Sequence, residues 1–226
     1  MTRKFTAYTT IMSVLLLYTL TGCKDEPDHP DEGLAICQNI VTYLGDSNGQ
    51  SVFGYQQIDD SPLVKLTING RIDSDKAPVG TRLLMTYTLP PGVAYGTDAT
   101  VNATSLQLIY QGKANLEPTE IPDMAATPGI YVMTLYRSGT YVNLLCRLPV
   151  TDGDRSFALV ADPATTNTPI PDLYLTTSAT TAGGFDRKVV GSFDMSEVWN
   201  STGCQGVRVH VNNTNNIYQQ TFLLTK

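Results

Sequence analysis

Short apolar segments separated by turn residues fill the chain from residue 35 to its end, and this pattern predicts an all-β protein. Residues 35–43 are rich in β-branched and apolar side chains, which favour strands. Residues 205–211 alternate most clearly, with three valines on one face and Arg208 and His210 on the other, as expected for a half-buried strand. Turn signals such as Asn48-Gly49 separate the segments, because these residues adopt positive φ angles readily.

The first group of segments predicts a small OB-like β-barrel over residues 35–115. Five strands are expected, at residues 35–43, 51–58, 63–68, 81–89 and 105–110. Five short strands in this length suit a small closed sheet, although other small β architectures share the pattern. Residues 90–104, rich in Gly, Ala and Thr, are expected to form a long loop before the last strand.

The second group of segments predicts a seven-stranded antiparallel β-sandwich over residues 130–226. Its strands are expected at residues 130–137, 141–148, 156–160, 172–177, 188–194, 205–211 and 218–224. Residues 116–129 contain three prolines and no regular period, so a linker is expected there. Residues 194–197 resemble a capping box that opens one helical turn. We expect this turn and Trp199, the only tryptophan, to close one end of the sandwich.

The N-terminus has the layout of an export signal, which we assign to residues 1–22. Arg3 and Lys4 precede an apolar run of ten residues at positions 11–20. A run of this length is too short to span a membrane permanently, but it is typical of a secretory signal.

The end of this signal resembles the bacterial lipobox, in which a leucine stands three residues before an obligatory cysteine. Here the motif consists of Leu20, Thr21, Gly22 and Cys23. The resemblance implies cleavage before Cys23, a diacylglycerol thioether on its sulfur, and an acyl chain such as palmitate on the new amine. Several acyl chains make a stable anchor. An ordinary cleaved signal with a chance cysteine is the alternative.

Residues 23–34 continue as an acidic segment with prolines, which is expected to stay extended as a tether. Its carboxylates could bind calcium, but a flexible segment holds no fixed coordination cage, and His29 reads as a spacer residue. Lys24, Asp25 and Glu26 resemble the surface-export signal of lipoproteins displayed by some Gram-negative bacteria. We therefore expect a lipid-anchored protein of the outer membrane that faces outward.

The charge of the chain narrows the choice of partners. The formal net charge is −6; removal of Arg3 and Lys4 with the signal leaves 13 basic against 21 acidic residues, or −8. An acidic protein repels phosphate backbones, so no nucleic-acid partner is expected. The same charge disfavours electrostatic docking to anionic lipid, and membrane contact is expected through the lipid anchor.

The sequence offers little catalytic chemistry, and we expect no enzyme, metal site or cofactor beyond the covalent lipid. It contains no Gly-x-Ser-x-Gly elbow, His-Glu-x-x-His motif or phosphate-binding glycine loop. His210 could belong to a triad, but its place in an alternating strand favours an exposed residue. The pairs Asp59/Asp60 and Asp152/Asp154 favour turns, with weak calcium binding at the second pair as the alternative.

Three cysteines remain once Cys23 is lipidated. An oxidising compartment allows one disulfide among them, and Cys146–Cys204 is the candidate because both lie in the predicted sandwich. Cys37 is then expected to be buried in the first strand, and three buried thiols are the alternative. Among the tyrosines, Tyr95 is a candidate ligand residue because it lies in the long loop 90–104, and loops on rigid scaffolds often carry function.

Three segments resemble the NigD-like lipoproteins: the acidic leader 24–32, the stretch PVGTRLLMTYTL at 78–89 and the segment SFDMS at 192–196. The resemblance covers essentially the whole mature chain and implies an N-terminal OB-like domain followed by a C-terminal β-sandwich. The family has no established biochemical activity. The chain departs from the family pattern at residues 152–157, which lack a histidine or aromatic cluster.

These observations lead to an expected function without catalysis. We expect a binding or accessory role at the cell surface, with a protein or glycan as partner. The family name suggests bacteriocin immunity as an alternative. A glycan-processing enzyme is a further alternative, which would require a cleft with two facing carboxylates.

Overall fold

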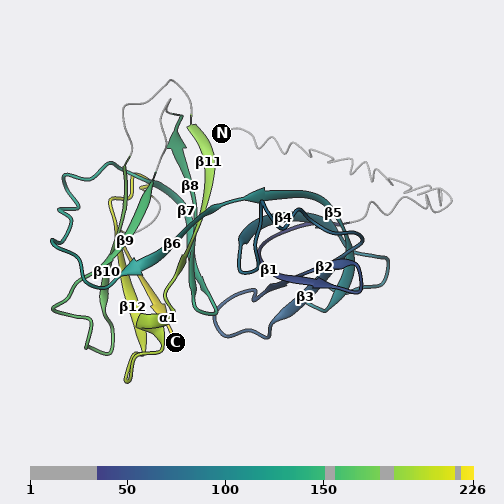
Figure 1. Cartoon of the computed structure of the whole chain (residues 1–226). Coiled ribbons are helices and arrows are strands. Elements are labelled where there is room, and N and C mark those ends of the chain that lie inside the picture. The colour runs from purple at the N-terminus through teal and green to yellow at the C-terminus, as the bar shows by residue number, and fades with distance from the viewer. Residues whose placement is uncertain (1–34, 151–155, 179–185, 217–219) are drawn as a thin grey trace, which may run out of the picture. The chain divides into compact units, whose positions relative to one another are not determined.

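The structure of the chain, a computed structural model, describes residues 35–150, 156–178, 186–216 and 220–226 (Figure 1). Within these ranges it contains thirteen strands and one short helix. The predicted all-β class is therefore confirmed. No helix among the described residues has the length and apolar character needed to cross a bilayer.

The first five strands form a closed barrel in the order β1-β2-β3-β5-β4. They are β1 (Ile36–Ser47), β2 (Gln50–Tyr55), β3 (Val64–Ile68), β4 (Arg82–Thr88) and β5 (Ala99–Leu108). Strands β3 and β5 pair in parallel, whereas the other neighbours are antiparallel. Alternate residues point inward, as strand geometry requires; on β4, for example, Leu83, Met85 and Tyr87 are buried in the barrel core.

The remaining strands form an eight-stranded sheet in the order β13-β12-β10-β9-β6-β11-β8-β7. They are β6 (Tyr110–Asn115), β7 (Tyr131–Ser138), β8 (Tyr141–Pro149), β9 (Phe157–Ala161), β10 (Asp172–Thr177), β11 (Asp186–Asp194), β12 (Gly206–Val211) and β13 (Thr221–Thr225). Strand β6 pairs in parallel with β9 and β11, and β10 pairs in parallel with β12. The seven strands predicted for residues 130–226 are therefore present as β7 to β13, but the sheet has an eighth strand, β6, and three of its pairings are parallel instead of antiparallel.

Strand β6 is the additional strand of this sheet, and it was not predicted from the sequence. It follows β5 after a single residue, and it lies between β9 and β11 in the second sheet rather than in the barrel. This differs from the predicted division, because the barrel strands end at Leu108 and residues 116–129 connect two strands of the same sheet. Strand β5 also begins at Ala99 instead of residue 105, so the predicted loop 90–104 is shorter.

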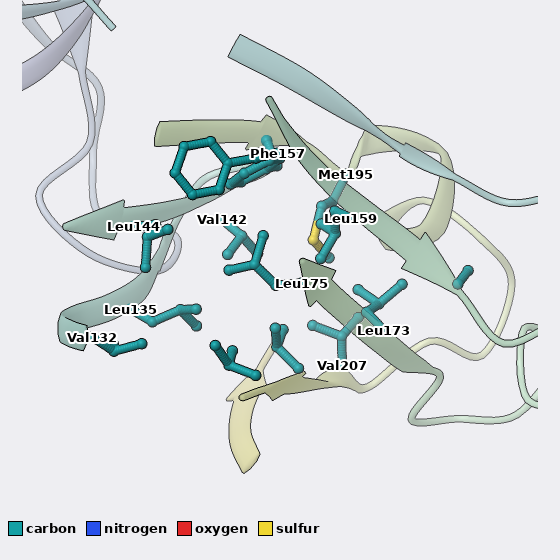
Figure 2. Packing of buried hydrophobic residues seen from close by; sticks show 14 of the residues in the cluster. Val132, Leu135, Val142, Leu144, Phe157, Leu159, Leu173, Leu175, Met195 and Val207 are labelled. Atoms are coloured by element: carbon teal, nitrogen blue, oxygen red, sulfur yellow. The ribbon is translucent and has the colours of Figure 1, made fainter. Parts of the chain in front are cut away.

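Both halves of the second sheet contribute to one apolar core. Figure 2 shows Val142 and Leu144 of β8 directed toward the same interior as Leu173 and Leu175 of β10. Each of these four side chains is almost completely buried. One continuous core across the sheet accounts for the sandwich-like pattern of the sequence.

Helix α1 (Ser196–Trp199) lies where the single helical turn was expected, and Trp199 is buried in the sheet core. The predicted capping box is absent. Met195 is the N-cap and makes no side-chain cap hydrogen bond, and Asp194 Oδ1 instead accepts a hydrogen bond from the Ser196 backbone N–H at 2.9 Å.

Candidate functional site

A cavity of about 290 Å³ lies where barrel strand β4 meets the second sheet, and we call it the Arg82 cleft. Its residues come from both the barrel and the sheet. They are Gly80, Arg82, Gln111, Gly112, Lys113, Tyr141, Ser192 and Asp194. Arg82 reaches this place because Leu83 points into the barrel core, and adjacent strand residues point to opposite faces.

The Arg82 guanidinium is fixed by three hydrogen bonds to neutral oxygens. Its Nε donates to Ser192 Oγ at 3.1 Å, its Nη1 to Thr42 Oγ1 at 2.8 Å and its Nη2 to Asn143 Oδ1 at 3.0 Å. Thr42 belongs to barrel strand β1, whereas Ser192 and Asn143 belong to β11 and β8. The side chain therefore joins the two sheets.

Arg82 carries a buried positive charge. The residue is only 3% exposed, and no carboxylate among the described residues forms an ion pair with it. Burial lowers the pKa of Arg82 to about 10, so the guanidinium remains charged at neutral pH. Its carbon lies 4.1 Å from the centre of the Tyr141 ring, and this cation–π contact supplies part of the missing stabilisation. A buried charge without a counterion is costly, which makes this arginine unusual for a structural residue.

The groups around Arg82 form a connected polar network. Ser192 Oγ also donates to Asn143 Oδ1 at 2.8 Å, and the Arg82 backbone N–H donates to Gln111 Oε1 at 2.7 Å. Asn143 is fully buried, and its Nδ2 has no hydrogen-bond partner among the described residues. One buried donor of the network thus stays unsatisfied within the described part of the chain, although the other members hold one another in place.

Lys113 and Asp194 supply the other charges of the Arg82 cleft. Lys113 lies on an exposed position of β6, and Asp194 ends β11. The Asp194 carboxylate caps the Ser196 N–H through Oδ1. With Arg82 and Lys113 positive and Asp194 negative, the lining carries a net charge of +1, although the chain as a whole is acidic.

A second buried arginine, Arg137, fastens the loop between β2 and β3 to the second sheet. Its Nη2 donates to Asp60, its Nε donates to the Gly139 carbonyl at 2.9 Å, and its guanidinium carbon lies 4.1 Å from the centre of the Trp199 ring. The Asp59 N–H donates to the Arg137 carbonyl at 3.0 Å. Asp59 and Asp60 are thus turn residues with a joining role.

His210 lies in a hydrogen-bonded chain that the sequence did not reveal. Asp172 Oδ1 lies 2.7 Å from His210 Nε2, and Thr221 Oγ1 lies 3.2 Å from Nδ1. Asp172 is shared with Arg208, whose Nη1 donates to the same oxygen, and the Tyr174 ring stacks on the imidazole at 4.9 Å between centroids. Because Arg208 neutralises the carboxylate, we interpret the cluster as a structural network on the sheet surface.

Hydrogen bonding also fixes the charge state of Asp172. Its partial burial acts to raise the pKa, but hydrogen bonds from His210 and Arg208 outweigh burial, and the pKa lies below its ordinary value. The carboxylate therefore stays ionised at neutral pH and accepts both hydrogen bonds.

Tyr95, the predicted ligand residue, is 51% exposed, and its hydroxyl accepts a hydrogen bond from Asn39 Nδ2 at 2.8 Å. It lies outside the lining of another cavity, which measures about 530 Å³. That cavity is lined by Ile68, Asn69, Pro90, Thr100, Val101, Asn102 and Ala103. Residues of the predicted loop 90–104 therefore line this cavity, namely Pro90 and residues 100–103 of β5, but Tyr95 does not.

The structure contains Cys37, Cys146 and Cys204 as thiols, so the suggested Cys146–Cys204 disulfide is absent from it. Cys146 lies within β8, and the Cys204 thiol lies 3.4 Å from the Gly206 carbonyl oxygen. The alternative of three thiols is the one that the structure has, although Cys37 is only partly buried.

Several predicted residues lie outside the described part of the chain. They are the lipobox residues Leu20, Thr21, Gly22 and Cys23, the export residues Lys24, Asp25 and Glu26, and the pair Asp152/Asp154. Within the described ranges, no group of three or more His, Cys, Asp or Glu side chains could hold a metal ion.

No protein-family model matches the sequence, and no curated protein does. Solved structures do match the fold. The protein of unknown function DUF1344 from Bacteroides vulgatus has a TM-score of 0.64 and 14% identity, over 85% of this chain and 91% of that chain. A NigD-like immunity protein from Bacteroides caccae has a TM-score of 0.57 and 15% identity, over 84% and 91%. A protein provisionally described as a lipoprotein, from Bacteroides fragilis, has a TM-score of 0.56 and 10% identity, over 84% and 98%.

These likenesses establish the fold, and at that level they confirm the resemblance to NigD-like proteins. The structure also shows that two of the three segments resembling NigD-like lipoproteins, 78–89 and 192–196, lie together at the Arg82 cleft. Gly80 and Arg82 come from the stretch 78–89, and Ser192 and Asp194 come from the segment 192–196. All four residues line the Arg82 cleft.

Proposed function

We propose that this protein is a lipid-anchored, non-enzymatic binding protein of the outer membrane that faces outward, with the Arg82 cleft as its ligand site. The observation that carries the binding role is the buried Arg82 cation, which neutral oxygens of both sheets hold beside a cavity. Clefts between structural units with a few fixed polar groups are common ligand sites. The partner would be a surface protein or glycan that inserts one small group.

The proposed anchor rests on the arrangement of the first 23 residues. The basic start, the short apolar run and the lipobox-like Leu20–Cys23 segment agree with each other. The likeness to a protein described as a lipoprotein supports the same reading. The acidic residues after Cys23 support outward display.

Replacing Cys23 with serine is expected to abolish membrane association, because the thioether lipid forms only on sulfur. The measurement is fractionation of cells that express the wild type or Cys23→Ser, together with protease treatment of intact cells. The wild type should pellet with membranes and be removed by the protease, whereas the variant should lose the membrane fraction. A matched Cys37→Ser variant should behave like the wild type, and membrane retention of Cys23→Ser would refute the anchor.

Small polar probes should raise the Tm of the purified mature protein if the Arg82 cleft binds a ligand group. We would test N-acetylglucosamine, triglycine, sodium acetate and inorganic phosphate at matched ionic strength. At least one probe should raise the Tm of the wild type and of Tyr131→Ala, which lies outside the cleft lining, but not that of Tyr141→Ala. No shift with any probe would overturn the proposed ligand site.

Bacteriocin immunity is the second candidate function. The observation in its favour is the likeness to a NigD-like immunity protein from Bacteroides caccae. It differs from the first candidate in a cellular outcome, because loss of the protein would then sensitise cells to a bacteriocin.

A further inference from the structure

We infer that the group bound in the Arg82 cleft is a small anion, a carboxylate or a phosphate, that completes the coordination of the Arg82 guanidinium. This inference rests on the proposed ligand site and names its chemistry. The anion could be free or could be the terminal group of a larger molecule, and a volume of about 290 Å³ suits either source.

The first argument is the number of unused donors on Arg82. A guanidinium carries five N–H groups. Three of them are bonded to Ser192, Thr42 and Asn143, so two have no protein acceptor within the described part of the chain. Donors on a guanidinium fit the paired oxygens of a carboxylate or phosphate, and such charge-assisted hydrogen bonds are stronger than neutral ones.

The second argument is the chemistry of the three existing acceptors. Two hydroxyls and one amide oxygen orient the guanidinium without neutralising it. A residue that served only to join the sheets could be paired with a carboxylate, as Arg137 is with Asp60. Arg82 keeps its whole positive charge at a buried position, and an entering anion would remove the cost of that charge.

The third argument is the direction of approach. The Tyr141 ring covers one face of the guanidinium at 4.1 Å. Hydrogen-bond donors of a guanidinium lie in its plane, at the edge. A ligand would therefore meet the edge of Arg82, while Lys113 adds a second positive charge to the lining and Asp194 opposes an anion.

Lys113 and Asp194, the other two charged residues of the cleft lining, are its rim charges. Their substitution allows a test that leaves Arg82 in place. We would measure binding of inorganic phosphate and of sodium acetate to the full mature protein by titration calorimetry at constant ionic strength. Lys113→Gln should weaken binding and Asp194→Asn should tighten it, each by about two- to fivefold, as for one partly exposed charge. Lys65→Gln, an exposed lysine on barrel strand β3, is the control and should leave the Kd unchanged.

Arg82→Lys gives a second measurement, since lysine keeps the positive charge but lacks the planar guanidinium with its paired N–H donors. It should weaken binding about tenfold or more, provided that circular dichroism shows the wild-type sheet content. If the variant does not fold, the rim variants decide the question. Binding of acetate but not phosphate would restrict the anion to a carboxylate, and the reverse result would restrict it to a phosphate.

The outcomes separate the inference from the proposed function. One outcome would overturn the inference but support the proposed ligand site. In that outcome N-acetylglucosamine or triglycine binds, neither Lys113→Gln nor Asp194→Asn changes its affinity, and neither anion binds. Anion binding that is insensitive to Lys113→Gln and Asp194→Asn would also overturn it. Failure of every probe would overturn the ligand site itself.

Discussion

Replacement of Phe193 by alanine is expected to lower the free energy of unfolding by about 3–5 kcal/mol, the usual cost of removing a fully buried phenylalanine. Phe193 lies on β11, where it is 1% exposed. Its ring centre is 5.8 Å from that of Tyr110 and 6.3 Å from that of Phe157. The glycine at 112 offers its bare backbone to the ring, since a Cβ there would lie 3.1 Å from Phe193 Cδ1.

The measurement is urea unfolding of the mature protein, followed by circular dichroism. Leu223→Ala is the control, because Leu223 is 56% exposed on β13, and a substitution at such a site changes stability by about 0.5 kcal/mol or less. A loss below about 1 kcal/mol for Phe193→Ala would contradict the packing of β6 against this ring. The result matters for the Arg82 cleft, because the neighbouring residues Ser192 and Asp194 line it.

The sequence predicted most strands because their side chains alternate or are β-branched. Strand β12 shows this best, with valines at its buried positions. Strand β6 was missed, since YQGKAN has few apolar residues and a central glycine, and its burial comes from tertiary pairing with β9 and β11. Tertiary context overrides weak local preference in such segments. The early start of β5 has a related cause, because residues 99–104 are mostly small and polar.

The Arg82 cleft could not be predicted from local pattern. Arg82 lies on the outer face of a barrel strand, and period-2 alternation assigns that face to solvent. The second sheet covers it, and its hydrogen-bond partners lie 40, 61 and 110 residues away in the sequence. The one available signal was the pair of segments that resemble NigD-like lipoproteins, since these segments come together at the cleft.

The two buried arginines differ in whether a carboxylate pairs with them. We use this difference to separate a structural contact between the two sheets from a candidate ligand site. Both stack on an aromatic ring at 4.1 Å and both connect the barrel to the second sheet. Arg137 has a carboxylate partner in Asp60 and two carbonyl acceptors, at Gly139 and Thr225. Arg82 has only neutral partners among the described residues and faces a cavity. Arg137 therefore has a protein counterion, whereas Arg82 has none among the described residues and lines a cavity.

Replacing Arg137 with methionine is expected to destabilise the protein by about 2–4 kcal/mol, because it removes a buried cation–π contact and leaves two carbonyl oxygens without their donor. Methionine retains much of the side-chain volume, so the loss should reflect the polar contacts. Removing only the carboxylate, with Asp60→Asn, should cost about 1 kcal/mol or less, because Asp60 is 66% exposed.

Urea unfolding measures both variants, with Arg208→Met as the control for loss of a half-exposed arginine on the sheet surface. The expected order of stability loss is Arg137→Met well above Asp60→Asn, with Arg208→Met no larger than Asp60→Asn. Equal losses for Arg137→Met and Asp60→Asn would mean that the ion pair dominates the joint. Arg137 would then depend mainly on a carboxylate, the kind of partner that Arg82 lacks among the described residues. The expected order instead places the stabilisation of Arg137 in the Trp199 ring and the two carbonyl oxygens, just as the Tyr141 ring and three neutral oxygens hold Arg82.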